Sequence, residues 1–168
     1  MKIKNIYVHH SAYPSDKFPD QFLLIDLHHK KKFGVKSSLG YYGGYTKLIG
    51  MDGSVKRYRV DGEEQTAQKG HNFNTVSYCL AMHGDREYPS EAMEKALTTE
   101  LDTTMAKYGL TFTDIKLHRE VRPTDCPGLN ITRTYIMNLL DRRHYQINLI
   151  KRLIELSMKL VGLLKKRK

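Results

Sequence analysis

Two histidines and one cysteine are the residues of this sequence best suited to chemistry. His9 follows the β-prone run 3–8, His118 follows the shorter run 115–117, and Cys126 lies eight residues later in a loop. Ligand sites gather at strand ends in open α/β sheets. Two imidazoles and a thiolate could bind zinc and leave the fourth tetrahedral position for water, as catalysis requires. Spacing alone leaves an alternative, in which residue 118 is a loop histidine and residue 126 a small buried hydrophobe.

The elements that must position these residues can be predicted from hydrophobic patterning. Asp52-Gly53 favours a tight hairpin, and the continuous apolar run at 76–82 is typical of a central strand. Ser90 is a helix-capping residue, and Gly109 follows the expected end of that helix. The pattern predicts strands at 3–8, 45–49, 55–60, 76–82 and 115–117, and helices at 20–32, with one apolar face, at 89–107 and at 132–140. This alternation predicts an α/β fold, with a mixed central β-sheet flanked by helices.

Length and composition indicate one globular domain with an appendage. The chain has 168 residues, of which 40% are hydrophobic and 27% are charged. No apolar run approaches the roughly 18 to 20 residues of a membrane-spanning helix. Two cysteines are too few for a disulfide framework, and the N-terminal run, interrupted by His9 and His10, does not read as a secretory signal. We therefore expect synthesis in the cytoplasm without a signal peptide.

The positive charge is concentrated at the C-terminal end of the chain. Residues 142–168 contain nine Lys and Arg against a single Glu, so most of the net charge of +10 lies there. We therefore predict a domain at 1–141 and a cationic helical tail at 142–168. The nearly neutral body weakens a nucleic-acid-binding interpretation, and no specific nucleic acid is expected as a partner.

Four motifs occur in a fixed order along the chain. They are Ile-Tyr-Val-His-His-Ser-Ala at 6–12, Gly44-Tyr45 ahead of a strand, Asn-Phe-Asn-Thr-Val at 72–76, and His-Arg-Glu-Val-Arg-Pro-Thr-Asp-Cys-Pro at 118–127. This order resembles the zinc-dependent N-acetylmuramoyl-L-alanine amidases, a family that includes phage lysis amidases and animal peptidoglycan recognition proteins. The resemblance covers residues 5–140, and its most specific part is the last motif joined to the first.

The resemblance implies roles for five residues. His9, His118 and Cys126 correspond to the family's zinc ligands, and Tyr45 corresponds to its active-site tyrosine. Thr124 falls where members carry lysine or threonine. The implied reaction is zinc-dependent hydrolysis of the amide between N-acetylmuramic acid and L-alanine in peptidoglycan. Tyr45 and Thr124 could donate hydrogen bonds to the attacking water or to the developing oxyanion.

One departure from the family pattern concerns the segment before the Asn-rich loop. Ala67 stands where many relatives carry a histidine, and His71 could supply that contact from a shifted loop. Asp125 is a candidate hydrogen-bond partner for a ligand histidine. The resemblance leaves three interpretations open: an endolysin-like enzyme acting at the cell wall after release, a cytoplasmic amidase recycling muropeptides, and a peptidoglycan-binding module without activity.

The tail has the pattern of an amphipathic basic helix. Apolar residues recur through 147–164, interrupted by Lys151, Arg152 and Lys159, and the chain closes on Lys-Lys-Arg-Lys. Such a helix at 144–168 could contact an anionic membrane or outer membrane, dock on the body, or pair with another copy. We expect the first of these, and a monomeric protein.

Overall fold

The computed structural model describes residues 2–165, with side chains described as far as residue 159. The end of the predicted basic run, at 166–168, lies outside this range. Five strands form one sheet of order β3-β2-β4-β1-β5. The elements are β1 (Asn5–His10), α1 (Phe22–Lys32), β2 (Lys47–Ile49), β3 (Val55–Arg57), β4 (Thr75–Leu80), α2 (Glu91–Tyr108), β5 (Ile115–Leu117) and α3 (Arg133–Lys165), with 3-10 turns at Phe112–Asp114 and His118–Glu120.

The sheet is mixed, as the sequence predicts. β4 lies at its centre, parallel to both β1 and β2, and β1 is also parallel to β5. The hairpin at Asp52-Gly53 joins β2 to the antiparallel β3. All six residues of β4 are buried, which explains why its sequence is apolar without alternation. The predicted fold class, a single domain with helices flanking a mixed sheet, is confirmed.

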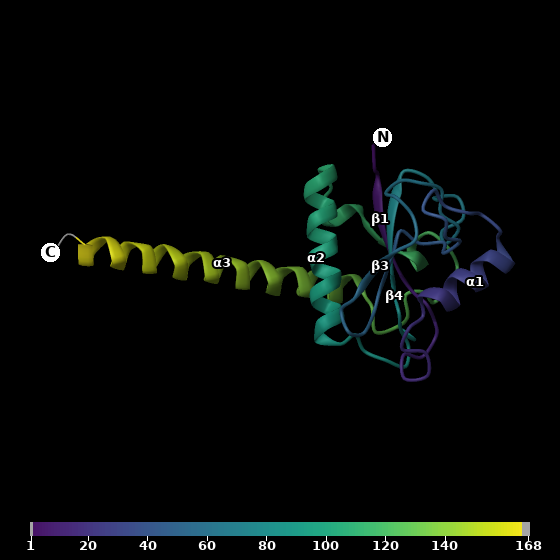
Figure 1. Cartoon of the computed structure of the whole chain (residues 1–168), viewed down its shortest axis with the longest axis horizontal. Helices are drawn as coiled ribbons and strands as arrows, with labels where there is room; N and C mark the ends of the chain where they lie inside the picture. Colours follow the sequence, from purple (N-terminus) through teal and green to yellow (C-terminus); the bar gives the residue numbers. More distant parts are fainter. Residues whose placement is uncertain (1, 166–168) are drawn as a thin grey trace.

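Helices cover both faces of the sheet (Figure 1). The larger core lies between the sheet and the helices α2 and α3, and includes Ile6, Val8, Met93, Leu97 and Leu140. A smaller core lies on the α1 face, and includes Phe22, Ile25, Tyr58 and Cys79. Alternate residues of β1 therefore enter different cores. Ile6 and Val8 belong to the larger core, so the side chain of His9 lies on the α1 face.

The two flanking helices differ in how well their sequences predict them. Ser90 caps α2 by accepting a hydrogen bond from the amide of Met93, and Gly109 ends it with a positive φ of 65°. The prediction of one apolar face for α1 is wrong in part. Leu23 and Leu27 are 64% and 65% exposed. They share a face one helical turn apart, and the sheet covers only the opposite face of α1.

Helix α3 is continuous across the predicted domain boundary at 141/142. Its first part packs on α2, and the contacts extend to Arg143 and His144, which both pair with Asp102 at 2.8 and 2.9 Å. Beyond these residues the helix projects away from the body (Figure 1). The predicted alternative in which the tail docks on the body does not fit the structure, since Tyr145 is 70% exposed and every residue at 151–159 is exposed. Within the described residues, no helix is long and apolar enough to cross a membrane.

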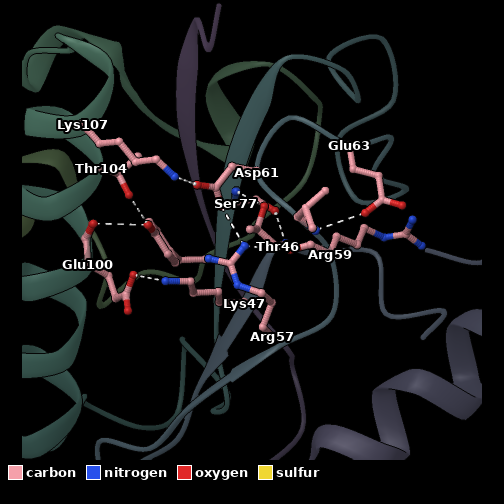
Figure 2. A network of polar contacts seen from close by, with 12 residues as sticks. Thr46, Lys47, Arg57, Arg59, Asp61, Glu63, Ser77, Glu100, Thr104 and Lys107 are labelled. Atoms are coloured by element: carbon pink, nitrogen blue, oxygen red, sulfur yellow. Dashed lines mark hydrogen bonds and ion pairs between the residues drawn. The ribbon is translucent and has the colours of Figure 1, made fainter. Parts of the chain in front are cut away.

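Ion pairs connect the edge of the sheet to α2 (Figure 2). The amine of Lys47 lies 2.5 Å from the carboxylate of Glu100. Asp61, in the loop after β3, pairs with Arg57 at 2.8 Å and with Lys107 at 3.0 Å. These ion pairs hold the β2–β3 edge of the sheet against α2. The candidate site lies in the other half of the sheet, at the carboxyl ends of β1 and β5.

Candidate metal centre

His9 lies near the carboxyl end of β1 and is 1% exposed. It is the register partner of Cys79 in β4, so both side chains lie on the α1 face of the sheet. β5 runs parallel on the other side of β1 and ends at Leu117, immediately before His118. Two parallel strand ends therefore bring the two histidines together, with ring centroids 4.5 Å apart.

Cys126 completes a cluster of three potential metal ligands. The donor atoms of His9, His118 and Cys126 all lie within 4.8 Å of one another. The cysteine sulfur lies 3.6 Å from Nδ1 of His9, so Nδ1 is the ring nitrogen that faces the cluster. The structure thus brings together the three residues that the sequence singles out, from two strand ends and one loop.

The loop carrying Cys126 is held by backbone contacts. The amide of Arg119 donates to the carbonyl of Cys126 at 2.9 Å, and the Arg119 guanidinium binds the carbonyls of Gly128 and Ile131. Gly84 and Gly128 pack backbone to backbone, and a Cβ at Gly84 would lie 1.9 Å from the carbonyl oxygen of Pro127. Neither glycine has room for a side chain. This close backbone packing holds the loop, and with it the sulfur of Cys126, in one position.

His10 has a different role from His9. Its side chain lies outside the donor cluster, and its Nδ1 accepts a hydrogen bond from the amide of Gly84 at 2.8 Å. Its own amide donates to the sulfur of Cys126 at 3.4 Å. His10 therefore helps to fix Gly84 and the sulfur, and His9 is the one of these two adjacent histidines that belongs to the donor cluster.

Electrostatics favour neutral imidazoles and a protonated thiol in the absence of a cation. Burial and the neighbouring His118 hold the pKa of His9 well below its usual value. Burial, Arg122 and His10 lower the pKa of His118 to about 4. Burial raises the pKa of Cys126 to about 12, against the opposing effects of the His10 amide and Arg119. Neutral imidazoles can bind a metal ion directly, and a divalent cation would favour the thiolate.

This donor set fits a zinc ion with one open position. Two imidazole nitrogens and one sulfur are three of the four ligands in a tetrahedral zinc site. His118 is only half-buried, whereas His9 and Cys126 are buried, so the cluster opens toward solvent on the His118 side. A fourth position on that side could be taken by water or by a substrate oxygen.

Tyr45 lies beside the cluster, half-buried, in the segment before β2. Its ring centroid is 5.1 Å from that of His9 and 5.4 Å from that of His29. Burial, together with Cys79 and Cys126, raises the pKa of Tyr45 well above its usual value, so the phenol stays protonated and can donate a hydrogen bond. His29 fixes the same segment, because its Nδ1 accepts from the amide of Gly44 at 2.7 Å.

Thr124 is exposed, and its hydroxyl oxygen accepts a hydrogen bond from the amide of Cys126 at 3.3 Å. Its proton therefore remains free to be donated. The carboxylate of Glu120 accepts a hydrogen bond from the amide of Leu117 and forms an ion pair with Arg133. Glu120 therefore has a structural role. Asp125 is exposed, and in the described part of the chain it makes no hydrogen bond to His9 or His118, contrary to the predicted contact.

One neighbour of the cluster was missed by sequence reasoning. Ala67 and His71 are the residues that the sequence indicates in this loop, yet the buried side chain of Gln68 is the one that raises the pKa of His9. The ring of His71 instead lies 5.9 Å from that of Tyr7. A glutamine in a polar loop has no periodicity to mark it, and none of the sequence motifs indicates a role for it.

Fold and site together define an α/β protein with a candidate catalytic metal centre at the carboxyl ends of its strands. The sequence profile of the N-acetylmuramoyl-L-alanine amidase family matches residues 1–129, and the chain belongs to this family.

Two curated relatives are similar over most of the domain. An N-acetylmuramoyl-L-alanine amidase of Sus scrofa is 29% identical over 138 residues, which is 77% of this chain and 23% of the relative. The endolysin of Escherichia phage T7 is 29% identical over 102 residues, which is 58% of this chain and 66% of the endolysin. The chain thus spans less than a quarter of the first relative and just under two thirds of the second.

Solved structures agree with the fold. The N-acetylmuramoyl-L-alanine amidase LysC from Clostridium intestinale URNW superposes with a TM-score of 0.71 at 26% identity, covering 84% of this chain and 87% of that one. The Drosophila peptidoglycan recognition protein SD gives a TM-score of 0.65 at 16% identity, covering 77% of this chain and 76% of that one. The second likeness concerns the fold alone.

Proposed function

We propose that this protein hydrolyses the amide bond between N-acetylmuramic acid and L-alanine in peptidoglycan, with zinc held by His9, His118 and Cys126. The observation that carries the proposal is the cluster of three donor atoms within 4.8 Å at the strand ends of a family member. The amidase and endolysin relatives support the substrate class. In this proposal the enzyme acts at the cell wall, in the manner of an endolysin.

The residues around the cluster have matching chemical roles in this proposal. When bound, zinc supplies Lewis-acid polarisation of the scissile carbonyl and lowers the pKa of water toward about 7. Tyr45, protonated across the neutral range, donates a hydrogen bond to the oxygen that gains negative charge. Thr124, whose oxygen accepts a hydrogen bond from the amide of Cys126, keeps its proton free for a second hydrogen bond to the same oxygen.

Mass spectrometry of products from purified sacculi tests the activity. We expect the wild type to release stem peptides with a free L-alanine amine, and we expect chelation or His118→Ala to abolish this release. His28→Ala is the matched control, because His28 is an exposed histidine on α1 outside the donor cluster. Binding to sacculi without release would indicate a recognition module instead. Cleavage of soluble muropeptides without cleavage of sacculi would indicate a recycling enzyme.

We further propose that the projecting part of α3 binds the surface of an anionic lipid membrane. Large apolar side chains are exposed there, with Ile150, Leu153 and Ile154 all more than half exposed. Lys151, Glu155 and Lys159 recur at intervals of four and so share one face of the helix, next to Arg152. An apolar face beside a cationic stripe complements the acyl chains and the anionic head groups of a bilayer.

Vesicle binding tests this second proposal. The full chain is expected to bind phosphatidylglycerol vesicles and to bind neutral phosphatidylcholine vesicles much less. Because each cation near an anionic surface contributes about 1 kcal/mol, Lys151→Glu with Arg152→Glu should weaken binding at least about tenfold. Lys30→Glu with Lys31→Glu, on the exposed face of α1, is the control. Unchanged binding after deletion of 147–168 would reject the proposal, and a concentration-dependent dimer in sedimentation would indicate self-association of the helix.

A further inference from the structure

His9 and Gln68 each have one buried polar atom that no other group satisfies. Nε2 of His9 and Oε1 of Gln68 are fully buried, and neither makes a hydrogen bond of standard geometry within the described structure. Gln68 itself is fully buried. The side chain of Gln68 nevertheless raises the pKa of His9, whereas the surrounding histidines lower it. A buried donor and a buried acceptor that lack other partners and lie side by side are expected to pair.

The orientation of the Gln68 amide is fixed by a chain of hydrogen bonds that begins at a backbone carbonyl. The carbonyl of Thr75 can only accept, and Nε2 of Gln65 donates to it at 2.8 Å. The Gln65 oxygen must therefore accept, and it does so from Ser77 and from Nε2 of Gln68 at 2.8 Å. Nε2 of Gln68 also donates to the hydroxyl oxygen of Thr75 at 3.0 Å. The amide nitrogen of Gln68 is thus used inside the network, and its oxygen is left to face His9.

This direction determines which ring nitrogen of His9 carries the proton. A carbonyl oxygen needs a donor, so Gln68 selects the tautomer protonated at Nε2. The same tautomer leaves a lone pair on Nδ1, the nitrogen that lies 3.6 Å from the sulfur of Cys126. A neutral imidazole binds a metal ion only through its unprotonated nitrogen, and the partner of the other nitrogen fixes the tautomer.

We infer that Gln68 is a positioning residue, which accepts a hydrogen bond from Nε2 of His9 and thereby presents Nδ1 to the metal ion. The inference rests on the metal centre in the proposed function and extends it to the residues behind the ligands. In this inference Thr75, Gln65, Gln68 and His9 form a buried chain of hydrogen bonds. Because the backbone carbonyl of Thr75 in β4 can only accept, the donor and the acceptor of each later bond are determined as far as His9 in the donor cluster. Loss of such a partner behind a ligand histidine typically weakens metal binding by about 10- to 100-fold.

Two measurements on the full chain test the inference. NMR of the ring nitrogens in zinc-free protein labelled at histidine should show the Nε2-protonated tautomer of His9. Gln68→Met, which keeps the volume and removes the acceptor, should lose this preference. Competition with a chelator should show zinc binding about 10- to 100-fold weaker in Gln68→Met. Gln21→Met is the control, since Gln21 is equally buried but donates to the carbonyl of Tyr13.

The outcomes separate this inference from the proposed function. Failure of the wild type to bind zinc would reject the metal centre itself. Tight zinc binding by both the wild type and Gln68→Met, with the same tautomer, would overturn only the role of Gln68. If Gln68→Met does not fold, the wild-type spectrum decides, because an Nδ1-protonated His9 in the zinc-free protein would also overturn the inference.

Discussion

Burial keeps the two histidines of the donor cluster neutral, whereas the same burial keeps Cys126 in its protonated form. Burial lowers the pKa of His118 to about 4 and holds the pKa of His9 well below its usual value, and it raises the pKa of Cys126 to about 12. At neutral pH the only proton that a bound cation must displace is therefore that of the thiol. The protonation states of the donor residues set the pH dependence of metal binding.

We predict that zinc binding at pH 6, below the pKa of about 7 expected for a zinc-bound water, releases about one proton, from Cys126, and none from the histidines. Zinc affinity should accordingly rise about tenfold per pH unit between about pH 5 and about pH 7, where the histidines are neutral, the thiol is protonated and a bound water keeps its protons. Calorimetric titration in buffers of different ionisation enthalpy measures the released protons. Release should disappear in Cys126→Ser, and release of two protons from the wild type would mean that a histidine is charged before binding.

Tyr45 can be tested without disturbing the metal ligands. Tyr45→Phe keeps the ring that packs beside His9 and His29 but removes the hydroxyl. We predict that kcat on a soluble muropeptide falls about 100- to 1000-fold, as for the loss of one oxyanion donor, with zinc affinity unchanged. Tyr41→Phe, whose ring packs on Phe22, should leave kcat unchanged. Equal kcat in Tyr45→Phe and the wild type would remove Tyr45 from the reaction.

The meeting of His9 and His118 could be predicted from the sequence because short apolar strands mark where these histidines lie, whereas their assignment as zinc ligands, together with Cys126, is implied by the family resemblance. Parallel strands end at the same edge, so two such residues meet whatever the loops do. Gln68 and Asp125 show the limit of this reasoning. Both lie in loops, and the orientation of Gln68 depends on hydrogen bonds to Gln65 and Thr75, which no sequence pattern indicates.

At the level of elements, a buried arginine organises the loops around the site. Arg59 follows β3 and is fully buried, and the described residues place no carboxylate within ion-pair distance of it. Its guanidinium instead donates to four backbone carbonyls, those of Gly43 at 2.6 Å, Val35 at 2.6 Å, Glu64 at 2.7 Å and Tyr42 at 3.3 Å. These carbonyls belong to the segments before Tyr45 and before Gln68. One side chain thus ties together the loops that carry two residues of the site.

We predict that Arg59→Met lowers the free energy of unfolding by about 3 kcal/mol or more, because several buried carbonyls lose their donor at once. Arg57→Met is the matched control, two residues away, where a partly exposed pair with Asp61 should contribute only about 1 kcal/mol or less. Urea denaturation monitored by circular dichroism measures both. A loss in Arg59→Met no larger than that in Arg57→Met would show that the loops hold without the arginine.

Elements with strong end signals were predictable, and those defined by packing were less so. Ser90 and Gly109 bracket α2 in the sequence, and both act as caps in the structure. In α1, by contrast, apolar residues occur on two faces of the helix, and the sequence does not state which face the sheet will cover. Phe22 and Ile25 are buried, whereas Leu23 and Leu27 face solvent.

At the scale of the whole molecule, charge and packing divide the chain at nearly the same place. The ion pairs between α3 and α2 involve Arg142, Arg143 and His144. The apolar side chains that anchor α3 in the core, Ile136 and Leu140, lie before these pairs. Beyond them the helix continues without support from the body, although neither its sequence nor its backbone contains a break. A continuous helix therefore joins the folded domain to an exposed cationic segment.

This arrangement predicts that the projecting segment contributes almost nothing to the stability of the domain. Deletion of 147–168 retains the pairs with Asp102 and removes exposed side chains, so the free energy of unfolding should change by less than about 0.5 kcal/mol. Leu140→Ala, which removes a buried side chain from the same helix, should cost about 2 to 5 kcal/mol. Urea denaturation of the two variants provides the comparison. A truncated protein as unstable as Leu140→Ala would mean that the segment folds back on the body in solution, where its apolar face could not bind lipid.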